Sequence, residues 1–173
     1  MNIYLFPTEL EAAPFRELRP TARVVITGVG LAATAATLAM LYREGCLVAS
    51  RVVLAGIAGT YGGRVAVGDV VEVVEECCAE LPERFRRRYS VVPTTRLRGV
   101  RSSSVHRGVD EGGDVDVENM EGAALFAMAE ALGFSACEVR AISNRVGEPY
   151  ERWRTEEALE ALARELVKMD DDE

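Results

Sequence analysis

The feature that most constrains the fold is an alternation of short apolar runs with longer segments of helical spacing. Runs with strand character cover residues 3–6, 22–27, 51–54, 69–75, 99–105 and 136–142. Segments with helical character lie between or after them, at 8–18, 31–43, 120–131 and 155–168. A helix between two strands carries the chain back across the sheet, so that the strands become parallel. The sequence therefore predicts an α/β fold in one domain over residues 1–173, with a mixed, mostly parallel twisted sheet flanked by helices.

Two of the helices have clear boundaries. The segment 31–43 is rich in alanine and leucine, and Gly45 follows it as a stop signal. The last helix begins near Thr155, a potential N-cap. Its buried stripe is predicted to consist of Leu159, Leu162, Ala163, Leu166 and Val167. Residues 77–98 show no readable pattern, and the acidic tail at 169–173 is predicted to fray.

Composition excludes several classes of function. The net charge of −8 gives no general attraction for nucleic acid, and the basic run 84–88 is predicted to be a solvated face. No apolar run reaches the length of a membrane span, and no cleavable leader is visible, so we expect a cytoplasmic protein without membrane contact. The four cysteines form no CxxC pair and are expected to be reduced. His106, the only histidine, suggests neither a catalytic triad nor a metal site.

One motif is similar to those that bind a dinucleotide cofactor. Gly28-x-Gly30-x-x-Ala33 follows a strand and opens a helix, as in the dinucleotide fingerprint. That fingerprint requires an acidic residue at the end of the next strand, which here ends at 54–56 with Leu-Ala-Gly. A tight turn explains these glycines equally well, so no cofactor is expected.

The stretch 117–124, Val-Glu-Asn-Met-Glu-Gly-Ala-Ala, joins a strand-like run to an apolar-faced helix that ends at Gly133. Glutamates in a first helical turn are often only partners of the helix dipole. The Glu121 carboxylate, however, accepts two hydrogen bonds and suits vicinal hydroxyls, while Met120 offers a soft apolar wall. Asn119 is predicted to be an N-cap.

A second stretch, Arg-Ala-Ile-Ser-Asn at 140–144, ends the next strand. Together the two stretches resemble the nucleoside phosphorylase and nucleosidase family, whose active site is built from a Met-Glu pair and an R-A-I-S-[DN] run. The resemblance covers residues 3–144 and is weakest at 77–117, which is shorter than is usual for the family. It implies a nucleoside phosphorylase-like fold, a nucleoside substrate with water, no metal or cofactor, and a homodimer or higher homo-oligomer.

The resemblance also implies roles for individual residues. Glu11 matches the glutamate that orients and deprotonates the attacking water, Glu121 the one that holds the ribose hydroxyls, and Asn144 the residue that faces the base. Arg140 would support the carboxylates. The implied substrate-binding residues are Thr8, Ile57, Ala58, Gly59, Ser104, Val105, Asn119, Met120 and Ser143. Phosphorylases of the family carry an arginine just before residue 56, where this chain has Leu54 and Ala55, and this departure favours hydrolysis.

Asn144 narrows the substrate. Adenosine-type nucleosidases have an aspartate there, which protonates the leaving base, whereas an amide complements the O6 and N7 edge of a 6-oxopurine. In this the chain is similar to 6-oxopurine phosphorylases and above all to futalosine hydrolases, which release hypoxanthine and dehypoxanthinyl futalosine on a route to menaquinone. The stretch 145–153, with Glu148, Tyr150 and Trp153, also resembles that subgroup. The alternatives are a purine nucleoside phosphorylase, a methylthioadenosine-type nucleosidase, or a non-catalytic nucleoside-binding domain.

Overall fold

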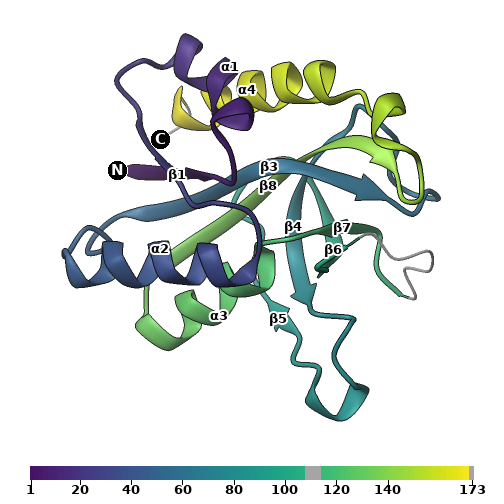
Figure 1. The fold of residues 1–173 in the computed structure, drawn as a ribbon. Coiled ribbons are helices and arrows are strands. Elements are labelled where there is room, and N and C mark those ends of the chain that lie inside the picture. The colour runs from purple at the N-terminus through teal and green to yellow at the C-terminus, as the bar shows by residue number, and fades with distance from the viewer. Residues whose placement is uncertain (108–113, 172–173) are drawn as a thin grey trace.

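The computed structural model describes residues 1–107 and 114–171, and its elements alternate as the sequence predicts (Figure 1). Strands and helices follow one another in the order β1 (Asn2–Phe6), α1 (Glu9–Leu18), β2 (Arg23–Ile26), α2 (Leu31–Arg43), β3 (Arg51–Thr60), β4 (Val70–Cys77), η1 (Glu83–Phe85), β5 (Tyr89–Ser90), β6 (Arg98–Ser104), β7 (Val117–Asn119), α3 (Gly122–Leu132), β8 (Ser135–Arg145), η2 (Tyr150–Arg152) and α4 (Thr155–Asp171).

The sheet is mixed, as predicted, but part of it closes on itself. Strand β3 pairs with β8, β8 with β4, β4 with β6, β6 with β7, and β7 returns to β3. A twisted sheet without a closed barrel was implied by the prediction of a mixed, mostly parallel twisted sheet, and the length of β3 explains the difference. Its first half pairs with β1, which extends the sheet to β2, whereas its last residues, Gly59 and Thr60, pair with β7. One long strand therefore belongs both to a closed five-stranded barrel and to an open wing.

Helices cover two opposite sides of this sheet, with α1 and α4 on one and α2 and α3 on the other (Figure 1). Two separate apolar clusters result. One joins Leu38 of α2 and Leu125 of α3 to the sheet. The other joins Phe15 of α1 to the predicted stripe of α4, of which Leu159, Leu162, Ala163 and Leu166 are buried. Burying such side chains contributes roughly 1.5–3 kcal/mol each, so the two layers fix the sheet that carries the site.

The ends of several elements differ from the sequence prediction, and two of these differences bear on the fold. The strand predicted over residues 51–54 is longer than expected, because β3 continues to Thr60. Helix α4 also extends to Asp171, into the acidic tail predicted to fray, while 172–173 lie outside the described residues. Asp170 accounts for part of this extension, because its carboxylate accepts hydrogen bonds from Tyr4 (2.8 Å) and Asn2 (3.3 Å) of β1.

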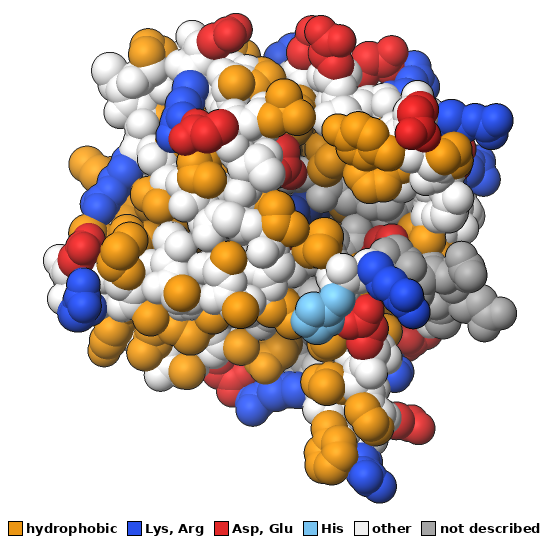
Figure 2. All heavy atoms as spheres, viewed as in Figure 1, with side chains coloured by type: hydrophobic (Ala, Val, Ile, Leu, Met, Phe, Trp, Pro, Cys, Tyr) orange, Lys and Arg blue, Asp and Glu red, His pale blue; other side chains and the backbone are white. Residues whose placement is uncertain are grey.

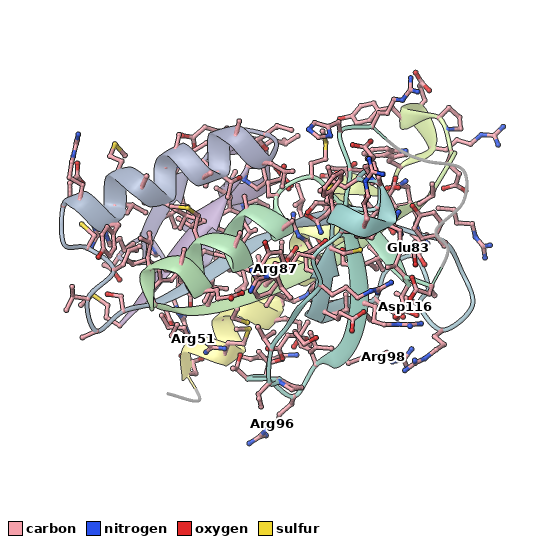
Figure 3. The ribbon with its side chains drawn as sticks, turned by 90° about the horizontal axis from the view of Figure 1, so that it is seen from below. Arg51, Glu83, Arg87, Arg96, Arg98 and Asp116 are labelled. Carbon is pink, nitrogen blue, oxygen red and sulfur yellow. The ribbon has the colours of Figure 1, made fainter. Side chains whose placement is uncertain are left out.

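The segment without a readable pattern forms a hairpin-like excursion. It holds the 3-10 turn η1 and the two-residue strand β5, which pairs with β4. Arg87 and Arg88 pair with acidic groups, Glu130 and Glu75 respectively. Figure 3 shows Arg51, Arg87 and Arg98 lying apart from one another rather than in a stripe. None of the described helices has both the length and the low charge content that a bilayer span requires.

The buried carboxylate of Glu72 on β4 holds residues 94–95 of this segment by hydrogen bonds. Glu72 accepts hydrogen bonds from the backbone N–H and the hydroxyl of both Thr94 (2.8 Å each) and Thr95 (2.9 and 2.7 Å). Burial opposes its ionisation, but these hydrogen bonds outweigh burial and lower the pKa of Glu72.

Glu72→Gln is therefore expected to reduce the free energy of unfolding by about 1–3 kcal/mol at pH 7, because an amide cannot accept all four bonds. A lowered folded-state pKa gives stability that is present above the unfolded-state value and lost as pH falls through the folded one. The deficit should thus shrink below pH 4.5, the ordinary value. Urea titrations at pH 7 and pH 4 measure it, with the exposed Glu130→Gln as control. A deficit that grew with acidity would contradict this account.

Candidate active site

A cavity of about 520 Å³ brings together residues that end or follow five strands, β1, β3, β6, β7 and β8. It opens on the face shown in Figure 2, where hydrophobic side chains surround a recess near the centre. Its lining contains Glu11, Glu121 and Asn144. The three side chains that the sequence predicts to act on a nucleoside therefore face one space.

Glu11 is held from two sides. The hydroxyl of Thr8 donates to Glu11 Oε2 (2.7 Å), and the backbone N–H of Ile57 on β3 donates to Oε1 (3.1 Å). Thr8 is also the N-cap of α1, since its oxygen accepts from the Glu11 N–H. Burial raises the pKa of Glu11, and the bonds from Thr8 and Ile57 offset this only in part. The result is a fixed carboxylate that is a stronger base than an exposed glutamate.

Glu121 lies immediately before helix α3 and is almost fully buried. Its Oε1 accepts from the backbone N–H of Gly30 (3.0 Å), and its Oε2 lies 3.2 Å from Arg140 Nη2. Gly30 has a φ of 94°, which only glycine adopts readily. The glycine motif at 28–30 thus turns an N–H toward a carboxylate of the chain itself, which accounts for the motif without a dinucleotide.

Asn119 holds the backbone at the start of helix α3 by hydrogen bonds. Its Oδ1 accepts from the backbone N–H groups of Glu121 (2.8 Å) and Gly122 (2.7 Å) and from Arg140 (3.1 Å). Both amide hydrogens are used as well, on Glu76 (2.8 Å) and Ser102 (2.8 Å). Asn119 thus binds the first N–H of α3, but the N-cap position belongs to Glu121, so the prediction of Asn119 as the N-cap residue was wrong by two positions. Asn119 lines the cavity, but its polar atoms are already committed.

Asn144 is oriented by its neighbours. The hydroxyl of Ser143 donates to Asn144 Oδ1 (2.8 Å), and Asn144 Nδ2 donates to the carbonyl of Arg145 (2.9 Å). One amide hydrogen and one lone pair remain for a ligand.

Two glycines of β3 make room for these groups. A Cβ at Gly56 would lie 2.7 Å from Arg140 Nη1 and 2.8 Å from Glu11 Oε1. One at Gly59 would lie 3.2 Å from Asn144 Nδ2. Close approach of the site side chains, rather than a turn, explains why glycine stands at both positions.

Two of the predicted substrate-binding residues do not line the cavity. Ser143 lies behind Asn144, and Ser104 bonds to Glu76 (3.3 Å) and to the N–H of Ala123 (2.8 Å). The hydroxyls of both serines are therefore used within the protein rather than turned toward the cavity. The other predicted residues do line it: Thr8, Ile57, Ala58, Gly59, Val105, Asn119 and Met120.

Sequence reasoning did not assign several lining residues: Pro7, Leu10, Val29, Glu118, Gly147, Glu148, Tyr150, Trp153 and Thr155. The rings of Tyr150 and Trp153 lie 5.2 Å apart, and Trp153 Nε1 donates to the Glu148 carbonyl (3.0 Å). This stretch between β8 and α4 has no periodicity, and its likeness to the futalosine hydrolase subgroup was the only available signal. Within the described ranges, no group of His, Cys, Asp or Glu is arranged to hold a metal.

Known proteins resemble this chain both in sequence and in fold. No protein-family model matches the chain. A futalosine hydrolase of Thermus thermophilus is 28% identical over 214 residues, covering 98% of this chain and 95% of the relative. Since this chain has 173 residues, at least 41 of the aligned positions lack a counterpart in it.

Solved structures show the same fold. The 5'-methylthioadenosine/S-adenosyl homocysteine nucleosidase of Helicobacter pylori superposes with a TM-score of 0.83 at 14% identity, covering 99% of this chain and 98% of that one. The native futalosine hydrolase of the same organism gives 0.81 at 15% identity, covering 99% and 97%. The resemblance of this chain to the nucleoside phosphorylase and nucleosidase family, indicated by its motifs, is thereby confirmed in its fold and along its length.

Proposed function

We propose that this protein hydrolyses the N-ribosidic bond of a 6-oxopurine nucleoside, namely futalosine, to give hypoxanthine and dehypoxanthinyl futalosine for menaquinone biosynthesis. The observation that carries the proposal is the convergence of Glu11, Glu121 and Asn144 on one cavity. Likeness along the whole chain to a futalosine hydrolase supports the choice of substrate.

The chemistry follows from the surroundings of the two acids. Cleavage of an N-ribosyl bond leaves positive charge on the sugar, as in the oxocarbenium-like states of glycosidases. Glu121 binds the ribose hydroxyls and faces that charge. Glu11, whose pKa burial raises, takes a proton from the attacking water. A positioned base of this kind contributes roughly 10²–10⁴-fold to the rate.

Asn144 binds the departing base. Its free amide hydrogen donates to the purine, which gathers negative charge as the bond breaks. An amide has no proton to transfer, so stabilisation of the leaving group is electrostatic. Glu11, Glu121 and Asn144 complete the reaction without a cofactor.

The charge of the lining favours water over phosphate as the nucleophile. Among the described residues that line the cavity, Glu11, Glu118, Glu121 and Glu148 are acidic, and none is Arg, Lys or His. The nearest cation, Arg140, is buried and already pairs with Glu138 and Glu121. A phosphate dianion would meet repulsion there, whereas neutral water would not.

The test is to incubate the protein with futalosine, inosine and methylthioadenosine, with and without phosphate, and to identify the free base by chromatography. We expect hypoxanthine from futalosine in phosphate-free buffer. A strict requirement for phosphate would select a phosphorylase, release of adenine alone would remove the argument from Asn144, and binding without turnover would select a nucleoside-binding domain.

Asn144→Asp is expected to shift the preference for futalosine over methylthioadenosine by at least about tenfold toward the adenine nucleoside. The aspartate would supply an acid for the base and would repel O6, and one lost charge-assisted contact is of this size. The measurement is the ratio of kcat/KM for the two substrates in one preparation, so that misfolded protein cancels. Ser143→Ala is the matched control, because it loosens the amide without adding charge. An unchanged ratio in Asn144→Asp would contradict the assigned contact.

The partner and the compartment belong to the same proposal. We propose a homodimer or higher homo-oligomer in the cytoplasm. Resemblance to the family supports the first, and the free state of Cys46, Cys77, Cys78 and Cys137 is in keeping with the second. Light scattering of the purified protein tests the oligomer, and a monomer at micromolar concentration would reject it.

A further inference from the structure

Behind the cavity lies a pair of carboxyl groups that the proposed mechanism does not use. Glu76 of β4 and Glu138 of β8 are both fully buried, and they meet beside the first residue of α3. A Cβ at Gly122 would lie 2.5 Å from Glu76 Oε2 and still closer to Glu138 Oε2. Both oxygens thus border the same point in space, and glycine is needed there.

The two carboxyl groups of the pair accept hydrogen bonds from different kinds of donor. Glu138 Oε1 accepts from Arg140 Nε (2.8 Å), so Glu138 faces a cation. The groups that donate to Glu76 are all neutral: the amide of Asn119 (2.8 Å), the hydroxyl of Ser104 (3.3 Å) and the backbone N–H of Cys77 (3.1 Å). A buried anion without a cation is costly, so Glu76 is the member that favours the neutral form.

One oxygen of this pair lacks a hydrogen-bond donor. Glu138 Oε2 is buried and has no hydrogen-bond partner among the described residues. A buried carboxylate oxygen without a donor is rare and costs free energy. A proton on Glu76 Oε2 would supply that donor and would also remove the repulsion between two adjacent anions.

We propose that Glu76 and Glu138 share one proton, carried by Glu76 toward Glu138 Oε2, and that this singly charged pair positions Arg140 against Glu121. Arg140 is the connecting group, because its Nε faces Glu138 and its Nη2 faces Glu121 at 3.2 Å. Glu76 is also linked to the backbone of Glu121 through Asn119, which donates to Glu76 and accepts the Glu121 N–H. The positioning role rests on the proposed function, whereas the shared proton does not.

The surroundings are consistent with one proton. Burial, and then the charge of Glu138, raise the pKa of Glu76 to about 8, while the pKa of Glu138 is raised by burial against the opposing pull of Arg140. The charged and titratable groups that face the pair are Arg140 on β8, Glu121 before α3, Glu11 on α1 beyond Arg140, and Cys77 and Cys78 on and after β4. Strands β6 and β7 present only Ser102, Ser104 and Asn119.

Infrared spectroscopy tests the proton directly. At pH 6.5 the wild-type protein should show a carbonyl band from a buried protonated carboxyl group, and Glu76→Gln should lack it. Glu130→Gln, an exposed change on α3, is the matched control and should keep it. Equal bands in wild type and Glu76→Gln would overturn the shared proton, whether or not the protein is an enzyme.

Unfolding gives an independent measurement. A folded-state pKa raised above the ordinary 4.5 gives stability that is full below 4.5 and lost as pH rises to about 8. Between these values wild type should release about one more proton on unfolding than Glu76→Gln does. Equal pH slopes would count against the pair.

Kinetics test the positioning role. Glutamine mimics a protonated glutamate, so Glu76→Gln should lose less than about threefold in kcat/KM, whereas Glu138→Gln removes the charge that holds Arg140 and should lose more than tenfold. Wild type should also lose activity above pH 8, and Glu76→Gln should lack this alkaline limb. Equal losses, or an alkaline limb that survives in Glu76→Gln, would reject the role. Absence of turnover on any nucleoside would reject the proposed function and leave the infrared result standing.

Discussion

Glu11→Gln is expected to lower kcat on futalosine by about 10²–10⁴-fold, because it removes the proposed base for the attacking water. Glutamine keeps the size of the side chain and can still accept the Ile57 N–H, so the fold should survive. The matched control is Glu9→Gln in the same helical turn, since Glu9 is exposed and pairs with Arg16. Steady-state kinetics and circular dichroism of both variants measure the difference.

The pH profile gives this prediction a second readout. Because the pKa of Glu11 lies above the ordinary 4.5, the acid limb of kcat/KM should fall at a higher pH than for an exposed glutamate. A carboxylate must lose its proton to act as a base, so activity decreases as pH falls through that value. An acid limb that Glu11→Gln leaves in place, or turnover like that of Glu9→Gln, would remove Glu11 from the mechanism.

Glu121→Ala should be nearly as damaging, with a loss of about 10²–10⁴-fold in kcat/KM. The ribose would lose two hydrogen bonds to a charged group, each contributing about 1.5–3 kcal/mol. Most of the loss should appear in kcat, since charge on the sugar develops only in the transition state. A 2′-deoxy substrate provides the complementary measurement, because it should lose far less activity in the variant than in wild type.

Stability is the necessary control for this variant. Removing the carboxylate leaves Arg140 with one fewer counter-charge and the Gly30 N–H without its acceptor. Glu121→Gln retains an acceptor for Gly30, so it should be the more stable of the two while remaining inactive. A Glu121→Gln protein that turns over at the wild-type rate would contradict the assigned contact with the ribose.

Local patterns predicted most of the fold. Helix α2 occupies the predicted residues because alanine and leucine favour helix and Gly45 stops it. Local patterns could not predict the closed barrel, because the pairings of β3 with β8 and of β7 with β3 join segments far apart in the chain. The sequence also does not distinguish a glycine that makes room for a neighbouring side chain, as Gly56 and Gly59 do, from one that makes a turn.

The site was predicted residue by residue only where motifs existed. Glu11, Glu121 and Asn144 reach one cavity as the resemblance implies, although their chemical roles stay predictions. Ser104 and Ser143 do not line the cavity, since their hydroxyls bond to Glu76 and to Asn144, and the order of residues in a motif does not show such internal partners. Arg140, by contrast, lies against the carboxylates as the sequence suggested.

The closure of the barrel determines when catalytic competence can arise. Strand β8 lies between β3 and β4 and carries Asn144, yet it is synthesised after both of them. Until it docks, the nascent chain exposes the unsatisfied edges of β3 and β4, which are templates for association with other chains. We therefore expect no partly active folding intermediate before β8 is inserted between β3 and β4.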